Sequence, residues 1–240
     1  MATARTATVV ETRDFGAETR VLSLVVDAPL GFVGGQYVIV DSGVILPGGK
    51  AAKRAYSILS ADADQHRFDL AVMRIPSGPC SGFLHHLAPG DAITFSGPWG
   101  KFHPAPDAQG RTLVVATDTG ITAALGLLQG ARLRPLLGQT AVRWLRMHAD
   151  YFLPEAFVRA RLPAGCDFAI EPIPAIGHPE RVPHARVVLR QLLASRAPAQ
   201  AFIAGDGAIN YALLDDLVTA GVPANRDSVD SFFNMPKKSA

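Results

Sequence analysis

The sequence predicts a fold in two parts, an antiparallel β-barrel followed by a parallel α/β domain. The first hundred residues or so contain six short runs rich in β-branched or aromatic residues, separated by Gly, Pro and Asp. From Arg111 onward, apolar runs alternate with helical patterns, which is typical of a parallel sheet covered by helices. A chain of 240 residues is long enough for two ordinary domains. We expect a six-stranded antiparallel barrel over residues 1–106 and an α/β domain over residues 107–240.

The barrel strands are predicted from runs of four to six residues that turn signals interrupt. One helix is expected among them, over residues 81–87, and residues 104–110 look like the linker between the domains. The predicted strands are 6–11, 21–26, 36–40, 55–59, 68–73 and 92–95.

In the second half, the strongest signals are continuous apolar runs, as buried parallel strands have. Ligands of such sheets bind beyond the carboxyl ends of the strands, so residues 117–120 and 205–207 are candidate binding turns. Residues 236–240 look like a loose tail. The predicted strands are 113–116, 141–145, 168–171 and 201–204, and the predicted helices are 121–128, 150–160, one within 182–195, and 208–220.

Composition excludes several classes of protein. With 48% hydrophobic and 18% charged residues the chain is globular, and its net charge of +2 does not suggest nucleic-acid binding. Two cysteines, Cys80 and Cys166, are too few for a disulfide framework or a four-cysteine cluster, and the histidines show no metal-ligand spacing. We find no signal-peptide core and no apolar run long enough to cross a bilayer, so we expect a cytoplasmic protein without bound metal.

The segment Arg54-Ala55-Tyr56-Ser57 carries the most chemistry in the barrel. In a strand, Arg54 and Tyr56 point to one side and Ser57 to the other. A guanidinium can hold phosphate, a tyrosine can stack on a flat heterocycle, and a serine can bond to the ring edge. These are the parts that a flavin nucleotide needs. The alternative interpretation is an ordinary strand with a surface arginine and a half-buried tyrosine.

A second candidate site precedes the predicted helix at 81–87. The segment 77–82 is small and turn-rich, and its backbone amides, with Ser81, would form an anion site at the helix start. The alternative interpretation is a helix simply capped by Ser81.

The order of these motifs resembles the ferredoxin–NADP⁺ reductase superfamily, and the resemblance covers nearly the whole chain. That family combines a flavin-binding barrel with a nicotinamide-nucleotide domain. Four of its motifs have counterparts here: Arg-x-Tyr-Ser at Arg54, Tyr56 and Ser57; Gly-x-x-Ser at Gly78 and Ser81; Gly-Pro-x-Gly-x-Phe at residues 97–102; and Phe-x-x-Gly-Gln-Tyr at residues 32–37.

The resemblance implies that hydride passes from NAD(P)H to FAD and that electrons pass on to a separate protein, such as a ferredoxin, a flavodoxin or an oxygenase component. It implies catalytic roles for Ser57 and for Phe232, whose ring would cover the flavin. Alternatives are a ferric-chelate (siderophore) or free-flavin reductase, and a regulatory module that has lost catalysis. The implied cofactor-binding residues are Arg54, Ala55, Tyr56, Ser57, Val72, Met73, Arg74, Gly78, Pro79, Cys80, Ser81, Thr119, Gly120, Arg146, Gly205, Asp206, Phe232 and Phe233.

The second domain departs from the family pattern at two turns. Asp118 replaces a turn glycine, and Ala204 stands where the family has a cysteine beside the nicotinamide. We expect differently tuned hydride transfer rather than its loss. Arg143 and Arg146 are expected just after the second strand, where an arginine would favour NADP, but the sequence around Asp150 also resembles NADH-using reductases. The choice between the two nucleotides stays open.

Overall fold

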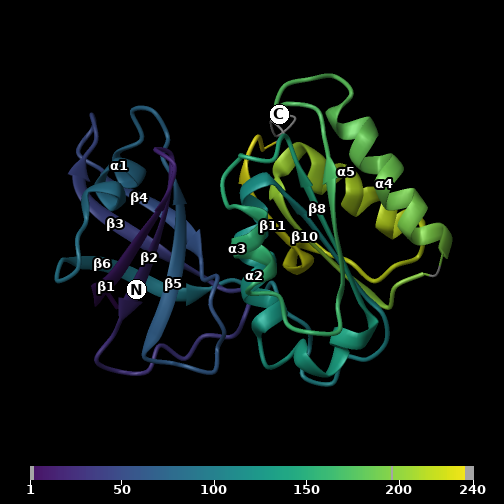
Figure 1. Ribbon diagram of the computed structural model, residues 1–240, viewed down its shortest axis with the longest axis horizontal. Helices are drawn as coiled ribbons and strands as arrows, with labels where there is room; N and C mark the ends of the chain where they lie inside the picture. The colour runs from purple at the N-terminus through teal and green to yellow at the C-terminus, as the bar shows by residue number, and fades with distance from the viewer. Residues whose placement is uncertain (1–2, 196, 236–240) are drawn as a thin grey trace.

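The computed structural model describes residues 3–195 and 197–235. The predicted antiparallel barrel is confirmed, with one helix that packs against three of its strands (Figure 1). Its elements are β1 (Arg5–Phe15), β2 (Thr19–Val25), β3 (Tyr37–Ile45), β4 (Ala51–Ser57), β5 (Arg67–Met73), α1 (Pro79–His86) and β6 (Ala92–Trp99).

The six strands pair in the order β4-β3-β6-β1-β2-β5, and every pairing is antiparallel. The two edge strands meet again just after β4, where Ile58 bridges Leu70 and the Leu59 amide donates to the Asp69 carbonyl at 3.1 Å. This closure follows Ser57 directly, so it fixes the end of β4 that carries the flavin motif. The interior is filled by alternating apolar side chains of the strands, such as Val38 and Val40.

The predicted α/β domain is also confirmed. Its five strands are all parallel, in the order β11-β10-β7-β8-β9. Its elements are β7 (Thr112–Thr117), η1 (Asp118–Gly120), α2 (Ile121–Gln129), η2 (Arg134–Gln139), β8 (Thr140–Arg146), α3 (Glu155–Arg159), β9 (Asp167–Pro172), α4 (Arg181–Ser195), β10 (Gln200–Asp206), α5 (Gly207–Thr219), η3 (Arg226–Ser228) and β11 (Val229–Phe233).

Two local predictions were wrong, and two elements were missed. Helix α1 begins at Pro79, two residues before the predicted start, because proline suits the first helical turn. Helix α3 covers only half of the predicted 150–160, since Phe152 adopts φ +67° and Pro154 precedes the helix. The parallel strand β11 and the short helix η2 were not predicted at all.

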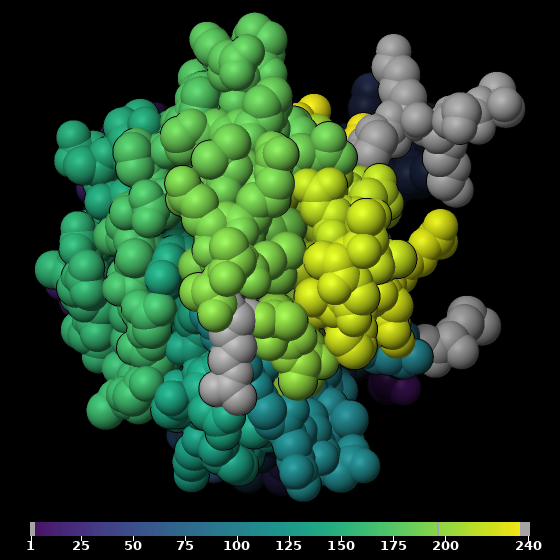
Figure 2. All heavy atoms as spheres, turned by 90° about the vertical axis from the view of Figure 1, so that its right-hand side faces the viewer, coloured from purple at the N-terminus to yellow at the C-terminus, as the bar shows by residue number. Residues whose placement is uncertain are grey.

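The sheet has helices on both faces. The face with α2 and α3 is turned to the barrel, and α4 and α5 cover the other face, where they lie side by side (Figures 1 and 2). No helix in residues 3–195 and 197–235 is both long and apolar enough to cross a membrane. The predicted boundary at residues 106/107 falls between β6 and β7 and stays a prediction.

Helix α2 joins the two domains through backbone contacts that only glycine permits. A Cβ on Gly126 would lie 2.1 Å from the Ile58 carbonyl oxygen, and one on Gly34 would lie 2.4 Å from the Gly126 carbonyl oxygen. The Gln129 side chain adds a 2.7 Å hydrogen bond to the Leu59 carbonyl. One hydrophobic cluster includes Leu59 and Phe102 from the first half of the chain together with α2, so the domains share a core.

Candidate functional site

The first half of the site lies where β4 meets α1. Tyr56 is half-buried beside the barrel core, and burial raises the pKa of its hydroxyl, with a smaller contribution from the neighbouring Cys80. Arg54 and Ala55 are exposed, and the Arg54 guanidinium donates to the Lys53 carbonyl at 3.2 Å. Arg54 thus projects from the strand with its charge available to a ligand.

The start of α1 lies at the segment for which an anion site was predicted, and its N-cap is Gly78 rather than Ser81. Gly78 is the N-cap and makes no side-chain cap, so the free amides of the first turn face outward from the helix start. Ser81 is buried, accepts from the Ile75 amide at 3.1 Å and donates to the Gly78 carbonyl at 3.1 Å. A Cβ on Gly78 would lie 2.8 Å from the Ser81 Oγ, so glycine is needed there.

The remaining predicted barrel residues surround this helix start. Cys80 is buried and its Sγ donates to the Ala52 carbonyl of β4 at 3.1 Å, which ties Pro79–His86 to the flavin-motif strand. Val72 is buried at the end of β5, and its carbonyl bonds to His85 Nε2 of α1 at 3.2 Å. Met73 is half-buried, while Arg74 follows β5 as an exposed cation. Exposed arginines and an uncapped helix start are both groups that bind phosphate, so the cofactor-binding role of these residues stays a prediction.

The second domain reaches this region through a contact that the sequence did not reveal. Ser57 is buried and its Oγ donates to Asp230 Oδ2 of β11 at 3.5 Å, across 173 residues of sequence. Burial raises the pKa of Asp230 to about 6, against the smaller effect of the Ser57 hydrogen bond. Burial, with the nearby Asp230 charge, also raises the pKa of Tyr37. A serine predicted at the flavin edge therefore stands next to an acid that titrates near neutrality.

The two predicted aromatic residues follow Asp230 on the same strand. Phe232 is 37% exposed, whereas Phe233 is half-buried and pairs in register with Asp206 of β10. The terminal strand thus carries an acid toward Ser57 and an aromatic ring toward solvent.

The two predicted turns of the second domain lie against each other. A Cβ on Gly120 would lie 2.2 Å from the Ala204 carbonyl oxygen, and Gly205 has φ +118° with its Cβ direction blocked by Thr117. Ala204 is buried in the core shared with the barrel, and Thr119 is partly exposed. The carboxyl edge of the sheet therefore presents a backbone surface built from two close turns.

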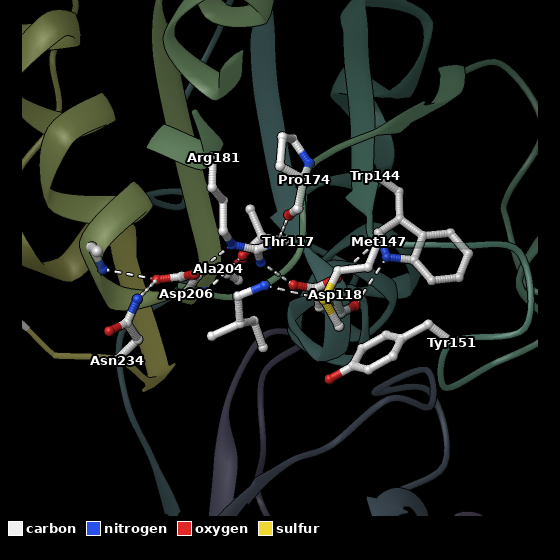
Figure 3. Close-up of polar contacts among 12 residues, drawn as sticks. Thr117, Asp118, Trp144, Met147, Tyr151, Pro174, Arg181, Ala204, Asp206 and Asn234 are labelled. Carbon is white, nitrogen blue, oxygen red and sulfur yellow. Dashed lines mark hydrogen bonds and ion pairs between the residues drawn. The ribbon is translucent and has the colours of Figure 1, made fainter. Parts of the chain in front are cut away.

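Beneath these turns lies a buried cluster of three charges, centred on Arg181 (Figure 3). Its guanidinium bonds to Asp118 Oδ2 through Nη2 and to Asp206 Oδ2 through Nε at 2.9 Å. Asp118 and Asp206 have no exposed surface and Arg181 is 2% exposed. Burial raises the pKa of Asp118 above its ordinary value, against the opposing effect of Arg181. Both carboxylates point inward, so the surface that a nucleotide would meet is backbone.

Sequence reasoning missed Arg181. The available signal was the pair of acids, Asp118 and Asp206, each at the carboxyl end of a predicted buried strand of one parallel sheet. Two carboxylates buried at the same edge need a cation to balance their charge. Nothing in the sequence said which of the many arginines would supply it.

Arg146, which was predicted to bind the nucleotide, belongs to β8 and not to either of these two turns. It is the last residue of β8 rather than a residue after the strand, and it is 6% exposed with its guanidinium 4.5 Å from the Trp144 ring. Arg146 Nη2 lies 3.7 Å from Glu155 Oε2, and Arg146 Nη1 has no hydrogen-bond partner among the described residues. Arg143 also lies inside β8 and pairs with Asp167 at 2.9 Å. The choice between NADH and NADPH stays open.

Comparisons with known proteins agree with this geometry. Residues 6–103 match the family model of the oxidoreductase FAD-binding domain. Ferredoxin–NADP reductase B of Sorangium cellulosum is 43% identical over 106 residues, which are 44% of this chain and 42% of that relative. The reductase subunit of an aromatic O-demethylase from Amycolatopsis sp. is 35% identical over 134 residues, 54% of this chain and 39% of that relative. The matched segments thus span about two fifths of these curated relatives.

The whole fold matches as well. A ferredoxin NADP⁺ reductase from Neisseria gonorrhoeae, solved with bound FAD and NADP, has a TM-score of 0.73 at 18% identity, covering 97% of this chain and 100% of that one. Residues 6–103 are thus similar to the oxidoreductase FAD-binding domain, and the whole chain has the fold of that ferredoxin NADP⁺ reductase, a barrel followed by a parallel α/β domain.

Proposed function

We propose that this chain is an NAD(P)H-dependent flavoprotein reductase that takes up hydride on FAD and passes electrons to a separate redox protein. The acceptor would be a ferredoxin, a flavodoxin or an oxygenase component. The proposal is supported by the relatives, which include reductase components, and by the site itself.

The observation that carries the proposal is the junction of the two domains at Ser57. The flavin-motif strand ends at this residue, and its hydroxyl meets Asp230 of the second domain. A ring system placed along β4 would therefore lie at the interface, where a second cofactor bound to the α/β domain could reach it. A binding module that only stores a flavin has no need for such a junction.

FAD and NAD(P)H supply the hydride chemistry when they are bound. The residues of the chain bind and orient. Arg54 and the amides at the start of α1 would hold the phosphates, Tyr56 would pack on the ring, and Ser57 would bond to its edge. Asp230, which accepts from Ser57, can hold a proton near pH 6 beside that edge. Such alignment of reactants can contribute about 7–11 kcal/mol of barrier reduction.

The test is the visible spectrum of the purified protein during anaerobic titration. We expect a yellow protein that releases FAD on denaturation and is bleached by NADH, NADPH or both. Re-oxidation is then followed with a ferredoxin, a flavodoxin, a ferric chelate and free flavin in turn. Fast re-oxidation by the protein acceptors supports the proposal. Preference for the chelate or free flavin would correct the acceptor.

Two results would replace the proposal. A protein that contains flavin but is bleached by neither nucleotide, though it is reduced by dithionite, is a module without reductase activity. A protein that stays colourless after incubation with FAD does not use the site at β4 and α1 as described.

A further inference from the structure

We infer that Arg181 is a positioning residue for the nicotinamide-nucleotide site, holding its two turns in register with each other and with the terminal strand. The inference rests on the proposed function, since it deepens the same site. Arg181 is the first residue of α4 and would touch neither cofactor directly, because it is buried below the turns.

The contacts of Arg181 join three separate connections of the parallel sheet (Figure 3). Nη2 reaches Asp118 in the turn after β7, Nε reaches Asp206 at the carboxyl end of β10, and Nη1 donates to the Pro174 carbonyl after β9 at 2.5 Å. A planar guanidinium fixes these groups in one geometry, which a flexible ammonium does not.

The same cluster reaches the flavin side of the molecule. Asp206 Oδ1 accepts from the Ala208 amide at 3.0 Å, capping α5, and from Asn234 Nδ2 at 2.9 Å. Asn234 directly follows β11, the strand whose Asp230 meets Ser57. A shift of Asp206 would therefore be felt both at the nucleotide turns and at the end of the strand that faces the flavin.

Stability alone is a poor reason for this cluster. Three buried charges carry a large desolvation cost, and apolar residues of similar size usually serve stability as well or better. The cluster holds two negative charges and one positive charge, and it is completed by backbone and amide donors, including the Met147 amide at 3.2 Å from Asp118 Oδ1. Its value lies in the single arrangement that it permits. Asp118 has φ +50°, so the side chain that pairs with Arg181 sits in a backbone conformation that few residues adopt without support.

The test compares Arg181→Lys and Arg181→Met with Arg186→Met. Arg186 lies on the same helix and pairs with Asp216 of α5 at 3.2 Å, away from the turns. For each holoprotein we would measure FAD content, the dissociation constants of NAD⁺ and NADP⁺, and the limiting rate of flavin reduction. We expect unchanged FAD content in all three. Both Arg181 variants should bind nucleotide at least about tenfold more weakly, and Arg186→Met should stay within about twofold of the unchanged protein.

Asn234→Gly keeps the test decisive where an Arg181 variant fails to fold. Asn234 is exposed and has φ +52°, which glycine adopts freely, so only the bond to Asp206 is lost. We expect an unchanged nucleotide dissociation constant, a limiting reduction rate lowered about threefold or more, and faster amide exchange in residues 229–233.

Three outcomes would overturn the inference. Folded Arg181→Lys that binds nucleotide as tightly as the unchanged protein removes the positioning role. So does Asn234→Gly with the original rate and exchange. An unchanged protein that binds neither nucleotide removes both this inference and the proposed function. Binding without flavin reduction removes only the proposed function, and the dissociation constants and amide exchange then decide the role of Arg181.

Discussion

At the scale of single residues, the contact between Ser57 and Asp230 has the clearest consequence for behaviour in solution. Asp230 is largely shielded from water. Among the described residues, no cation contributes to the shift of its pKa. Ionising Asp230 therefore requires more free energy in the folded protein than in the unfolded chain. The free energy of unfolding should therefore depend on pH, and the raised pKa sets the direction.

Asp230→Asn should stabilise the flavin-free protein above pH 7, and the advantage should decline as the pH falls from 6 to about 4. The folded pKa of about 6 lies above the ordinary value of 3.8, so ionised Asp230 opposes folding above pH 6 and the penalty fades as the folded form takes up its proton. We expect the free energy of unfolding to rise by about 1–2 kcal/mol at pH 7.5. This is less than the full pKa shift implies, because part of the Asp230 surface stays in contact with solvent. Thermal unfolding at pH 4, 5 and 7.5 measures it.

Asp227→Asn is the matched control for this pH series. Asp227 is exposed close to the same strand and pairs loosely with Lys101 at 3.5 Å. Its substitution should change stability by about 0.5 kcal/mol or less at each pH. A parallel pH profile for the two variants would show that Asp230 is not the group that titrates.

Arg54→Ala should weaken FAD retention more than Arg74→Ala. Arg54 is an exposed residue of β4, the strand that packs against α1, and a lost charge-assisted contact to phosphate costs about 1.5–3 kcal/mol. The flavin dissociation constant should rise about tenfold or more. Arg67→Ala controls for a lost surface arginine of the barrel, because Arg67 pairs with Glu11 at 3.1 Å. Equal flavin binding by all three variants would make Arg54 an ordinary surface residue.

At the scale of elements, helix α2 does two tasks. Its start follows the turn Asp118–Gly120, which lies at the nucleotide edge of the sheet, and its Gly126 lies on the Ile58 carbonyl at the end of the flavin strand. One short helix thus fixes the distance between the two cofactor sites. Its apolar residues are buried along its whole length, which leaves little freedom to move.

Gly126→Ala should therefore damage both stability and flavin binding. The added methyl would lie 2.1 Å from a backbone oxygen that cannot rotate away, and overpacking of this kind costs about 1–3 kcal/mol or more. Gly138→Ala is the control, because that glycine is exposed and nothing lies near its Cβ direction. Urea unfolding and FAD content measure the two effects. Equal stability of the two variants would mean that the helix has room to shift.

The elements also show what the sequence can predict and why the rest was missed. Continuous apolar runs such as Leu113 to Ala116 announce buried strands by composition alone, and turn residues delimit the barrel strands. Strand β11 escaped because Asp230 and Ser231 interrupt its apolar pattern and its pairing with β10 is long-range. The Arg181 cluster escaped for a related reason: its partner Asp118 lies 63 residues away, and only the folded sheet brings them together.

At the scale of the whole molecule, the two sheets form one body. The hydrophobic cluster around α2 draws on both halves of the chain, and the barrel meets α3 again where the Phe15 and Phe157 rings lie 4.8 Å apart. Asp62 adds hydrogen bonds to the amides of Gly34 and Ala131, one on each side of the interface. Separating the domains would expose apolar surface at several places at once.

We therefore expect the flavin-loaded protein to unfold in a single transition. Flavin fluorescence reports the barrel, and Trp144, buried in the α/β domain, reports the other half, although Trp99 contributes from the barrel. The midpoints followed by flavin release and by far-UV circular dichroism should coincide. The variant Trp99→Phe makes the tryptophan signal specific to the α/β domain. Two separated midpoints would show that the domains are independent folding units.

The glycine contacts along α2 also bear on how ligands come and go. Hinged enzymes open to admit a ligand and close to shield it, and a hinge needs slack between the moving parts. Backbone packed on backbone at Gly34 and Gly126 leaves none. Nucleotide must then enter and leave by the open edge of the sheet while the two halves stay together. Turnover of the proposed reductase should then need no opening of the domains, so the association rate of nucleotide should respond to ionic strength and show no lag for a domain motion.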